Sequence, residues 1–155
     1  MPETNSLLLD RLRSINAELA SWVSEAPLPS LTDGPRIPLD RSLIASLDGA
    51  IRSAVLLVAG ELDASHDISQ SLHDSLGSYL HGIMHRREGD FSNAKYWFAR
   101  AGSVAGIDFD PALFVDRVAQ AVQAGKIEEK ELCDRQWQEW CVIAISALER
   151  QNSLG

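Results

Sequence analysis

The apolar residues of this chain recur at helical spacing along almost its whole length, and this periodicity constrains the fold more than any other feature. No segment shows the strict apolar–polar alternation of a half-buried strand. We expect helices over residues 7–24, 41–59, 63–72, 78–87, 91–101, 111–124 and 128–151. Residues 73–77 are expected to form a turn. The sequence therefore predicts an all-α fold of six or seven helices, packed as antiparallel hairpins.

Prolines divide the chain into three parts. Four of the six prolines lie between Glu25 and Leu39, where each removes an amide donor and disfavours helix in the preceding residue. We therefore expect an N-terminal helix within residues 1–24, a Pro-rich strap over residues 25–39 and a helical body over residues 40–155. A length of 155 residues fits a single domain that contains all three parts.

The charge balance argues against some classes of partner. The chain has 14 Lys and Arg residues against 22 Asp and Glu residues, a net charge of −8 at pH 7. Nucleic acids and anionic membranes attract a positive field, so we expect neither as a partner. The apolar runs fall short of the ~20 residues of a membrane span, and the first residues lack the basic start of a signal peptide.

The two cysteines, Cys133 and Cys141, indicate a reducing compartment. They are eight residues apart on one expected helix, about 12 Å of rise, which is too far for a disulfide within that helix. We expect both to be small core residues and the protein to be cytoplasmic.

Residues 75–105 carry small and aromatic residues in the order of one tetratricopeptide repeat. The matching positions are Gly82, Gly89, Phe91, Ala94, Phe98 and Ala101. This segment resembles one helical hairpin of that family, which implies that small residues let the paired helices approach while large ones fill the gaps. We therefore expect tetratricopeptide-like packing around residues 48–102. The segment departs from the family pattern at His81, His85 and Gly106, where the repeat has large apolar residues and a proline.

The run from His81 to Phe98 carries a second resemblance. Its pattern, His-x3-His-Arg-Arg-Glu-x-Asp…Asn-Ala-Lys-Tyr-Trp-Phe, is similar to a signature of uncharacterised bacterial all-helical proteins. The resemblance implies a family and a functional focus in this segment, without an activity.

Local positive charge on an otherwise acidic chain indicates a site for an anion. Residues 81–100 contain four cationic side chains against two carboxylates. The fixed fork of arginine suits bidentate recognition of carboxylate or phosphate groups. We predict that residues 73–100 bind an anionic small molecule or an acidic peptide. Its charge would be neutralised by Arg86, Arg87 and Lys95, and Tyr79 and Asn93 would orient it. In the alternative interpretation, the arginines pair with nearby acids in a solvated network.

The histidines support a second hypothesis, a metal-dependent and hydrolytic enzyme. All four fall within twenty residues, at His66, His73, His81 and His85. His81 and His85 share one helix face, and Glu88 lies three residues further along it, so the three could hold a divalent metal ion. His66 or His73 would complete the shell, and Asp90 or His73 would handle protons. The competing interpretation is that the histidines are hydrogen-bonded packing residues.

The third hypothesis is a structural helical bundle that forms a homodimer through its amphipathic N-terminal helix. The sequence contains no Walker loop, dinucleotide fingerprint or serine elbow that would indicate a particular enzyme. Binding protein, metalloenzyme and structural bundle therefore stay open, as does the question of whether the protein is an enzyme.

Overall fold

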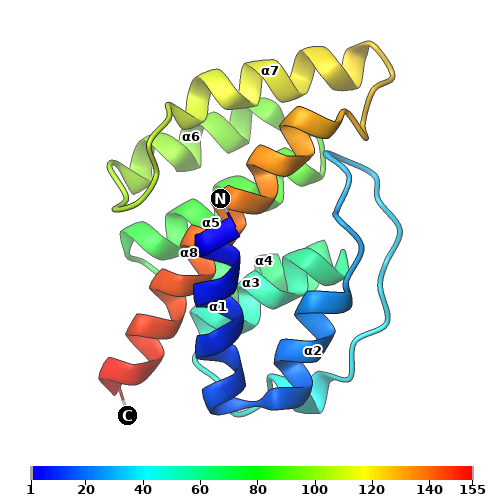
Figure 1. Ribbon diagram of the computed structural model, residues 1–155. Helices are drawn as coiled ribbons and strands as arrows, with labels where there is room; N and C mark the ends of the chain where they lie inside the picture. Colours follow the sequence, from blue (N-terminus) through cyan, green and yellow to red (C-terminus); the bar gives the residue numbers. More distant parts are fainter. Residues whose placement is uncertain (1, 155) are drawn as a thin grey trace.

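The computed structural model describes the backbone of residues 2–154 and the side chains of residues 3–151. In this part of the chain, eight α-helices and one short 3₁₀ helix are present and strands are absent (Figure 1). The helices are α1 (Pro2–Ile15), α2 (Ala17–Glu25), α3 (Gly49–Ala59), α4 (Leu62–Ser69), α5 (Ser75–Arg87), α6 (Phe91–Ala101), α7 (Pro111–Gln123) and α8 (Lys130–Leu154), with the 3₁₀ helix η1 at Arg41–Leu43. None of these helices has the length and apolar character that crossing a membrane requires. The all-α prediction is confirmed, with one α-helix more than expected.

The extra helix arises at Asn16, which divides the helix expected over residues 7–24. The backbone of Asn16 is extended, and its side chain accepts a hydrogen bond from the Leu19 amide at 3.1 Å. An asparagine in this position caps the first turn of a new helix. As a result α1 ends and α2 begins around Asn16, and the two short helices lie side by side (Figure 1).

The helix expected over residues 41–59 is wrong in its first half. Residues 41–48 form η1 and a turn, and the Asp40 side chain caps η1 by accepting from the Ser42 amide at 2.9 Å. Asp48 then caps α3 by accepting from the Ala50 amide at 3.3 Å. Two capping aspartates in one segment therefore start two short helices where the apolar spacing alone predicts one.

The turn expected over residues 73–77 is also wrong. Asp74 accepts a hydrogen bond from the Gly77 amide at 2.9 Å, and α5 already begins at Ser75. The aspartate is thus a helix cap rather than part of a turn. The other helices begin and end within a few residues of their predicted bounds, and α6 matches them at both ends.

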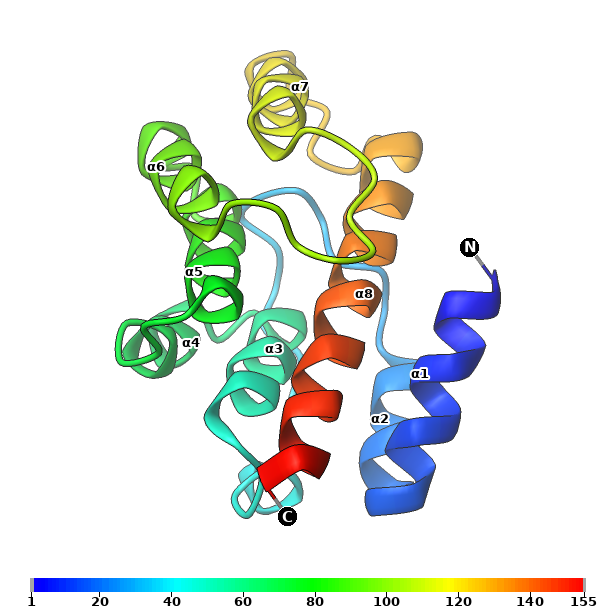
Figure 2. The ribbon, with the colours of Figure 1, turned by 90° about the vertical axis from the view of Figure 1, so that its left-hand side faces the viewer.

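Two helical hairpins form the middle of the molecule. α3 pairs with α4, α5 pairs with α6, and α7 lies against α6 (Figure 2). α8 crosses this arrangement and contacts α1, α3 and α5, so it joins the N-terminal helices to the hairpins. In the α5–α6 hairpin, a Cβ at Gly82 would lie 2.7 Å from ring carbons of Phe98. The missing side chain at Gly82 is therefore what allows these two helices to approach.

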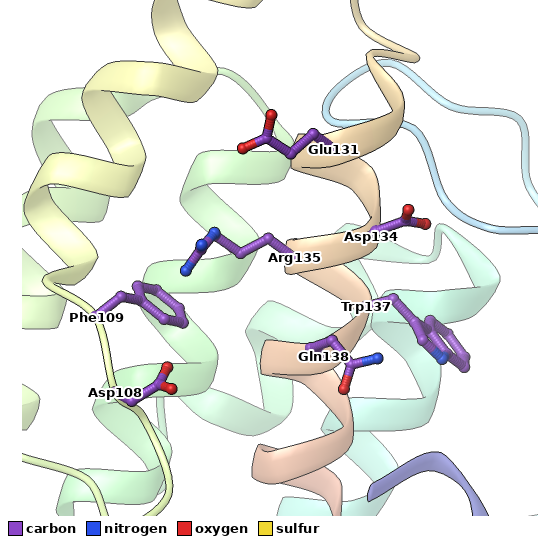
Figure 3. A pocket seen from close by; sticks show the side chains of 7 residues that line it. All are labelled: Asp108, Phe109, Glu131, Asp134, Arg135, Trp137 and Gln138. Atoms are coloured by element: carbon purple, nitrogen blue, oxygen red, sulfur yellow. The ribbon is translucent and has the colours of Figure 1, made fainter. Parts of the chain in front are cut away.

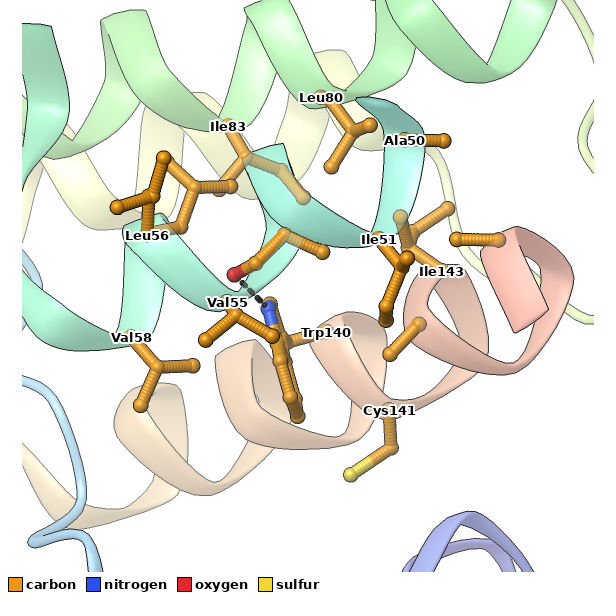
Figure 4. Packing of buried hydrophobic residues seen from close by; sticks show 14 of the residues in the cluster. Ala50, Ile51, Val55, Leu56, Val58, Leu80, Ile83, Trp140, Cys141 and Ile143 are labelled. Carbon is orange, nitrogen blue, oxygen red and sulfur yellow. Dashed lines mark hydrogen bonds between the residues drawn. The ribbon is translucent and has the colours of Figure 1, made fainter. Parts of the chain in front are cut away.

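The core is centred on α3, which is buried on nearly every side. Residues 55–58 of this helix are each at most 2 % exposed. Trp140 from α8 packs against them, and its Nε1 donates a hydrogen bond to the Ala54 carbonyl oxygen at 2.8 Å (Figure 4). This bond satisfies an indole N–H that burial would otherwise leave without a partner.

The segment after α2, residues 26–40, contains most of the expected strap and docks on the helical body. The Leu31 amide donates to the Ile127 carbonyl oxygen at 2.7 Å, and the Ile37 amide donates to the Ala59 carbonyl oxygen at 2.9 Å. Leu31 is fully buried and packs with apolar residues of α7 and α8. The strap is therefore held to the body at two separate points.

Cys133 and Cys141 are free thiols, and both are buried in α8. Burial raises the pKa of Cys141 to about 12. Burial also raises the pKa of Cys133, helped by nearby carboxylates. The prediction that both are core residues is confirmed.

Candidate functional site

Three of the four histidines come together between α4 and α5. His81 and His85 lie one turn apart on α5, with ring centroids 4.8 Å apart and ring planes 21° from parallel. His66 from α4 meets them edge-on, with its ring centroid 4.7 Å from that of His81 and 5.7 Å from that of His85. One nitrogen atom from each ring lies within 4.8 Å of the other two. We call His66, His81 and His85 the histidine cluster.

His81 is the buried member of the cluster and is covered by Trp97. Its side chain is 4 % exposed, and the Trp97 ring from α6 stacks on it at 3.9 Å between centroids, 9° from parallel. Burial, and then the neighbouring His85 and His66, lower the pKa of His81 to about 4. The imidazole is therefore neutral at pH 7 and keeps a lone pair on one ring nitrogen.

A carboxylate orients His85. Its Nδ1 lies 2.6 Å from Glu88 Oε1 and 3.9 Å from Asp90 Oδ2. We assign the Nδ1 proton to the hydrogen bond with Glu88, which leaves the lone pair on Nε2. Metal-bound histidines usually have this arrangement, with a carboxylate or carbonyl on the nitrogen that faces away from the ion. In the described part of the chain, this is the only hydrogen bond to a ring nitrogen of the cluster.

The ligand set predicted from spacing, His81, His85 and Glu88, is divided between two groups. His81 and His85 group with His66, whereas Glu88 groups with His85 and the aspartate that caps α6. His66 thus occupies the position beside His81 that spacing alone assigns to Glu88. His73 is exposed and belongs to neither group.

Asp90, expected to handle protons, is engaged by its own helix. Its carboxylate caps α6, accepting from the Asn93 amide at 3.3 Å and from Asn93 Nδ2 at 2.7 Å. The side-chain hydrogen bond from Asn93 is the main reason that the pKa of Asp90 is lowered. The carboxylate that contacts the histidine cluster directly is therefore Glu88.

Arg86 lies in a buried polar network rather than on a surface. Its side chain is fully buried, with Nη2 2.5 Å from Glu139 Oε1 and Nη1 3.1 Å from Glu139 Oε2. Tyr79 donates its hydroxyl hydrogen to the same carboxylate at 2.7 Å, and Gln136 Oε1 accepts from Arg86 at 3.4 Å. Burial, and then the charge of Glu139, raise the pKa of Tyr79, so the phenol stays protonated. We call Tyr79, Arg86, Gln136 and Glu139 the arginine network.

The five residues predicted to bind an anion do not form one surface. Two of them belong to the arginine network. Arg87 is also buried, and its Nη1 donates to the Leu57 carbonyl oxygen at 2.8 Å. Asn93 is exposed and bonded to the cap of its own helix, and Lys95 pairs with Asp116 of α7 at 2.6 Å. Anion binding by this set stays a prediction, with each of its members already in contact with a protein group.

An open cavity of about 440 Å³ lies away from the histidine cluster, between α8 and the loop before α7 (Figure 3). Arg135 extends from α8 toward Phe109, with its guanidinium carbon 5.3 Å from the ring centroid. Glu131 and Asp134 also line the cavity, and each is paired with a neighbouring cation. Two of the acids that line the cavity are thus already paired, Phe109 and Trp137 supply apolar wall, and none of the clustered histidines lines it.

Sequence reasoning does not identify the parts played by Trp97 and Glu139. A signal for Glu139 is present, because Gln136, Glu139 and Ile143 share one face of α8 and two polar residues therefore stand on an otherwise apolar stripe. No spacing in the sequence links Trp97 to His81, since that contact depends on how α6 packs against α5.

The histidine cluster is therefore the strongest candidate in the molecule for binding a ligand or taking part in a reaction. It combines a neutral buried imidazole, a second imidazole oriented by a carboxylate and a third from another helix. Its function has to be inferred from this geometry, because no family model, no curated protein and no solved structure matches the chain.

Proposed function

We propose that this protein binds a divalent transition metal ion, of which zinc is the best match, through His66, His81 and His85. The observation that carries the proposal is the convergence of these three imidazoles from α4 and α5, with a nitrogen of each within 4.8 Å of the others. Nitrogen ligands about 2.0–2.1 Å from one ion lie roughly 3.4 Å apart. Binding of an ion would therefore draw the three nitrogens closer together than the 4.8 Å limit within which they now lie.

The protonation of the cluster favours an ion over protons. A metal ion needs a neutral imidazole, and the lowered pKa of His81 keeps this ring unprotonated throughout the neutral range. With the Nδ1 proton assigned to the hydrogen bond with Glu88, His85 keeps the lone pair of Nε2 for an ion. Zinc accepts imidazole nitrogen readily, and three such ligands leave one position of a tetrahedral ion for water.

That fourth position defines the class of reaction. A zinc-bound water has a pKa near 7, so it supplies hydroxide at neutral pH. We propose hydrolysis of an ester or a phosphoester, for which an ion held by His66, His81 and His85 would supply the attacking hydroxide. Glu88 would act as a positioning residue, through His85, rather than as a ligand.

The first experiment measures metal binding by the chain freed of metal with a chelator. Titration with Co²⁺ should give the visible absorption of a tetrahedral ion at one equivalent, and Zn²⁺ should displace it. His66→Gln and His85→Gln should abolish the tetrahedral signal. His73→Gln is the matched control, because it removes an exposed histidine outside the cluster. Absence of the signal, or its loss in His73→Gln but not in His66→Gln, would refute the proposal.

A second variant tests whether Glu88 orients His85 or binds the metal ion itself. We expect Glu88→Gln to keep the tetrahedral Co²⁺ spectrum and to lower the Zn²⁺ affinity by about 10–100-fold, since orienting partners contribute to this extent. Loss of the spectrum would instead show that Glu88 binds the ion. Hydrolysis of a nitrophenyl ester by the zinc-loaded protein, compared with its His66→Gln variant, tests the reaction class.

We also retain two finer predictions as proposals. The close contact of Gly82 with Phe98 supports a tetratricopeptide-like α5–α6 hairpin. The free, buried thiols of Cys133 and Cys141 support a cytoplasmic location.

A further inference from the structure

Arg87 is a buried cation that lacks a carboxylate partner among the described residues. Its side chain lies at the end of α5, the residue is 5 % exposed, and Nη1 donates to the Leu57 carbonyl oxygen at 2.8 Å. The buried Nε atom has no hydrogen-bond partner. The remaining N–H groups have none within the described part of the chain either, and no acid comes within ion-pair distance. A buried charge without a counter-charge is strongly unfavourable in a protein interior.

Arg87 lies beneath the strap, beside a cavity in which a ligand could contact its unmatched charge. A cavity of about 140 Å³ lies between the strap, from Pro27 to Ile37, and the helical body, where Val58 and Arg87 line it. A narrower space on the α8 side of the same arginine is also lined by Val58. Figure 1 shows the strap as the long connection that leaves α2 and returns toward α3. Arg87 thus lines a space between the strap and the helical body, and no acid of the described residues pairs with its charge.

The residues that line this cavity determine which anions it can bind. They are mostly apolar, and three of those from the strap are prolines, which have no N–H to offer. The Ser30 hydroxyl already donates to the Thr32 carbonyl oxygen at 3.2 Å. Glu128, which is exposed, also lines the cavity and disfavours a ligand with more than one negative charge. A phosphate ion would find too few donors here, whereas a singly charged carboxylate with an apolar tail suits the surroundings.

We propose that the cavity under the strap binds a short-chain monocarboxylate, with its carboxylate on the Arg87 guanidinium and its hydrocarbon tail against Val58 and Ile37. An apolar cavity of about 150 Å³ holds a molecule the size of benzene. By this measure the cavity under the strap, at about 140 Å³, takes an acid of roughly the size of butyrate. This site is separate from the histidine cluster and does not depend on a metal ion.

The charge state of Arg87 supports this assignment. Burial, and then the adjacent Arg86, lower the pKa of Arg87 to about 10, while the nearby Cys133 acts in the opposite direction. The guanidinium therefore still carries its positive charge at pH 7. The charge of Arg86 is already matched by Glu139, which leaves Arg87 as the cation available to the ligand.

The test measures binding of butyrate to the full chain, in EDTA so that metal plays no part. Thermal unfolding and saturation-transfer NMR are recorded with sodium butyrate, sodium phosphate and sodium chloride at equal ionic strength. We expect butyrate to raise the unfolding midpoint by several degrees and to give a transfer signal from its methyl end. Phosphate should do neither. Binding of phosphate without butyrate, or of neither anion, would overturn the proposal.

Three variants assign the site. Arg87→Met should weaken butyrate binding at least tenfold, and Arg36→Met is the matched control, because it removes an exposed arginine from the same strap. Ile37→Trp fills the cavity while keeping the Arg87 charge, and it should also abolish binding. If Arg87→Met does not fold, Ile37→Trp alone decides: unchanged butyrate affinity in that variant refutes the site under the strap.

Discussion

Two polar clusters lie on opposite faces of α5, and they differ in the hydrogen bonds and ion pairs that the protein makes with their side chains. The arginine network faces α8, where Glu139 accepts two bonds from Arg86 and one from Tyr79. The histidine cluster faces α4 and α6, and its ring nitrogens have one hydrogen bond among the described residues, from His85 to Glu88. Both clusters are substantially buried, so exposure alone does not distinguish them.

The difference supports a stabilising role for the arginine network and the metal site that we propose at the histidine cluster. In the arginine network, each charge has an opposite charge at hydrogen-bond distance, and the Arg86 guanidinium also lies 4.8 Å from the Phe114 ring centroid. In the histidine cluster, one ring nitrogen of each histidine lies within 4.8 Å of the other two, and no carboxylate of the described residues lies among the three rings. Among the described residues, the buried side-chain nitrogen and oxygen atoms without a partner include Nε of Arg86 but no ring nitrogen of the histidine cluster. The contrast therefore lies in the pairing of charges and not in buried atoms left without hydrogen bonds.

Of the changes that test this comparison, breaking the arginine network should lower the free energy of unfolding most. Glu139→Gln removes the counter-charge of a fully buried arginine, and we expect a loss of about 3–5 kcal/mol in the free energy of unfolding. The measurement is urea denaturation of the variant and the parent protein at pH 7. Glu149→Gln is the control, since it removes the same charge from an exposed pair with Arg11 and should change stability by less than about 1 kcal/mol. Equal losses in the two variants would remove the distinction between the network and an ordinary surface pair.

Protonation of His81 in the histidine cluster should lower the free energy of unfolding by a somewhat smaller amount. Folded His81 binds a proton only below about pH 4, whereas an unfolded histidine does so below about pH 6.5. The unfolded state therefore binds more protons between these values, and stability falls as the pH is lowered through this window. The full contribution of His81 is about 3 kcal/mol.

The measurement is the free energy of unfolding of the metal-free protein from pH 7 to pH 4. His81→Phe keeps a ring against Trp97 and should remove this part of the pH dependence. His73→Gln should retain it, because His73 is exposed and lies outside the cluster. A pH dependence that His81→Phe leaves unchanged would show that His81 is not held neutral by its surroundings.

The smallest effect should come from removing one donor of the arginine network while keeping its charge pair. Tyr79→Phe loses the bond to Glu139 but leaves Arg86 in place, and we expect a loss of about 1–2 kcal/mol. Tyr96→Phe is the matched control, since Tyr96 is 54 % exposed and should contribute less than about 0.5 kcal/mol. Thermal or urea unfolding of both variants gives the comparison. A Tyr79→Phe loss as large as that of Glu139→Gln would mean that the hydroxyl, and not the ion pair, holds the network together.

The fold was predictable from the sequence where local signals agree. α6 has its predicted bounds because Asp90 caps its start and Gly102 follows its end with a positive φ of 67°. The segment 41–48 was not predictable from periodicity, because its apolar residues pack equally well from a 3₁₀ helix and a turn. Asn16 likewise divides one amphipathic pattern into two helices, since a side-chain cap competes locally with continuation of the helix.

The site was predictable only within a single helix. The spacing of His81 and His85 places them on one face of α5, and this pairing is confirmed. The sequence also offers His66 and His73 as further ligands from outside this helix, and the choice of His66 depends on the packing of α4 against α5, which no local pattern encodes. The burial of Arg86 likewise depends on Glu139, which is 53 residues further along the chain.

The separation of Arg86 and Glu139 by 53 residues has a consequence for synthesis of the chain. Ribosomes add about 5–20 residues per second, so Arg86 is added to the chain roughly 3–10 s before the glutamate that neutralises it. During this interval the α8-facing side of α5 carries a cation without its counter-charge, and burying it in that state is unfavourable. We therefore expect the core to close over α5 only after α8 has been added to the chain.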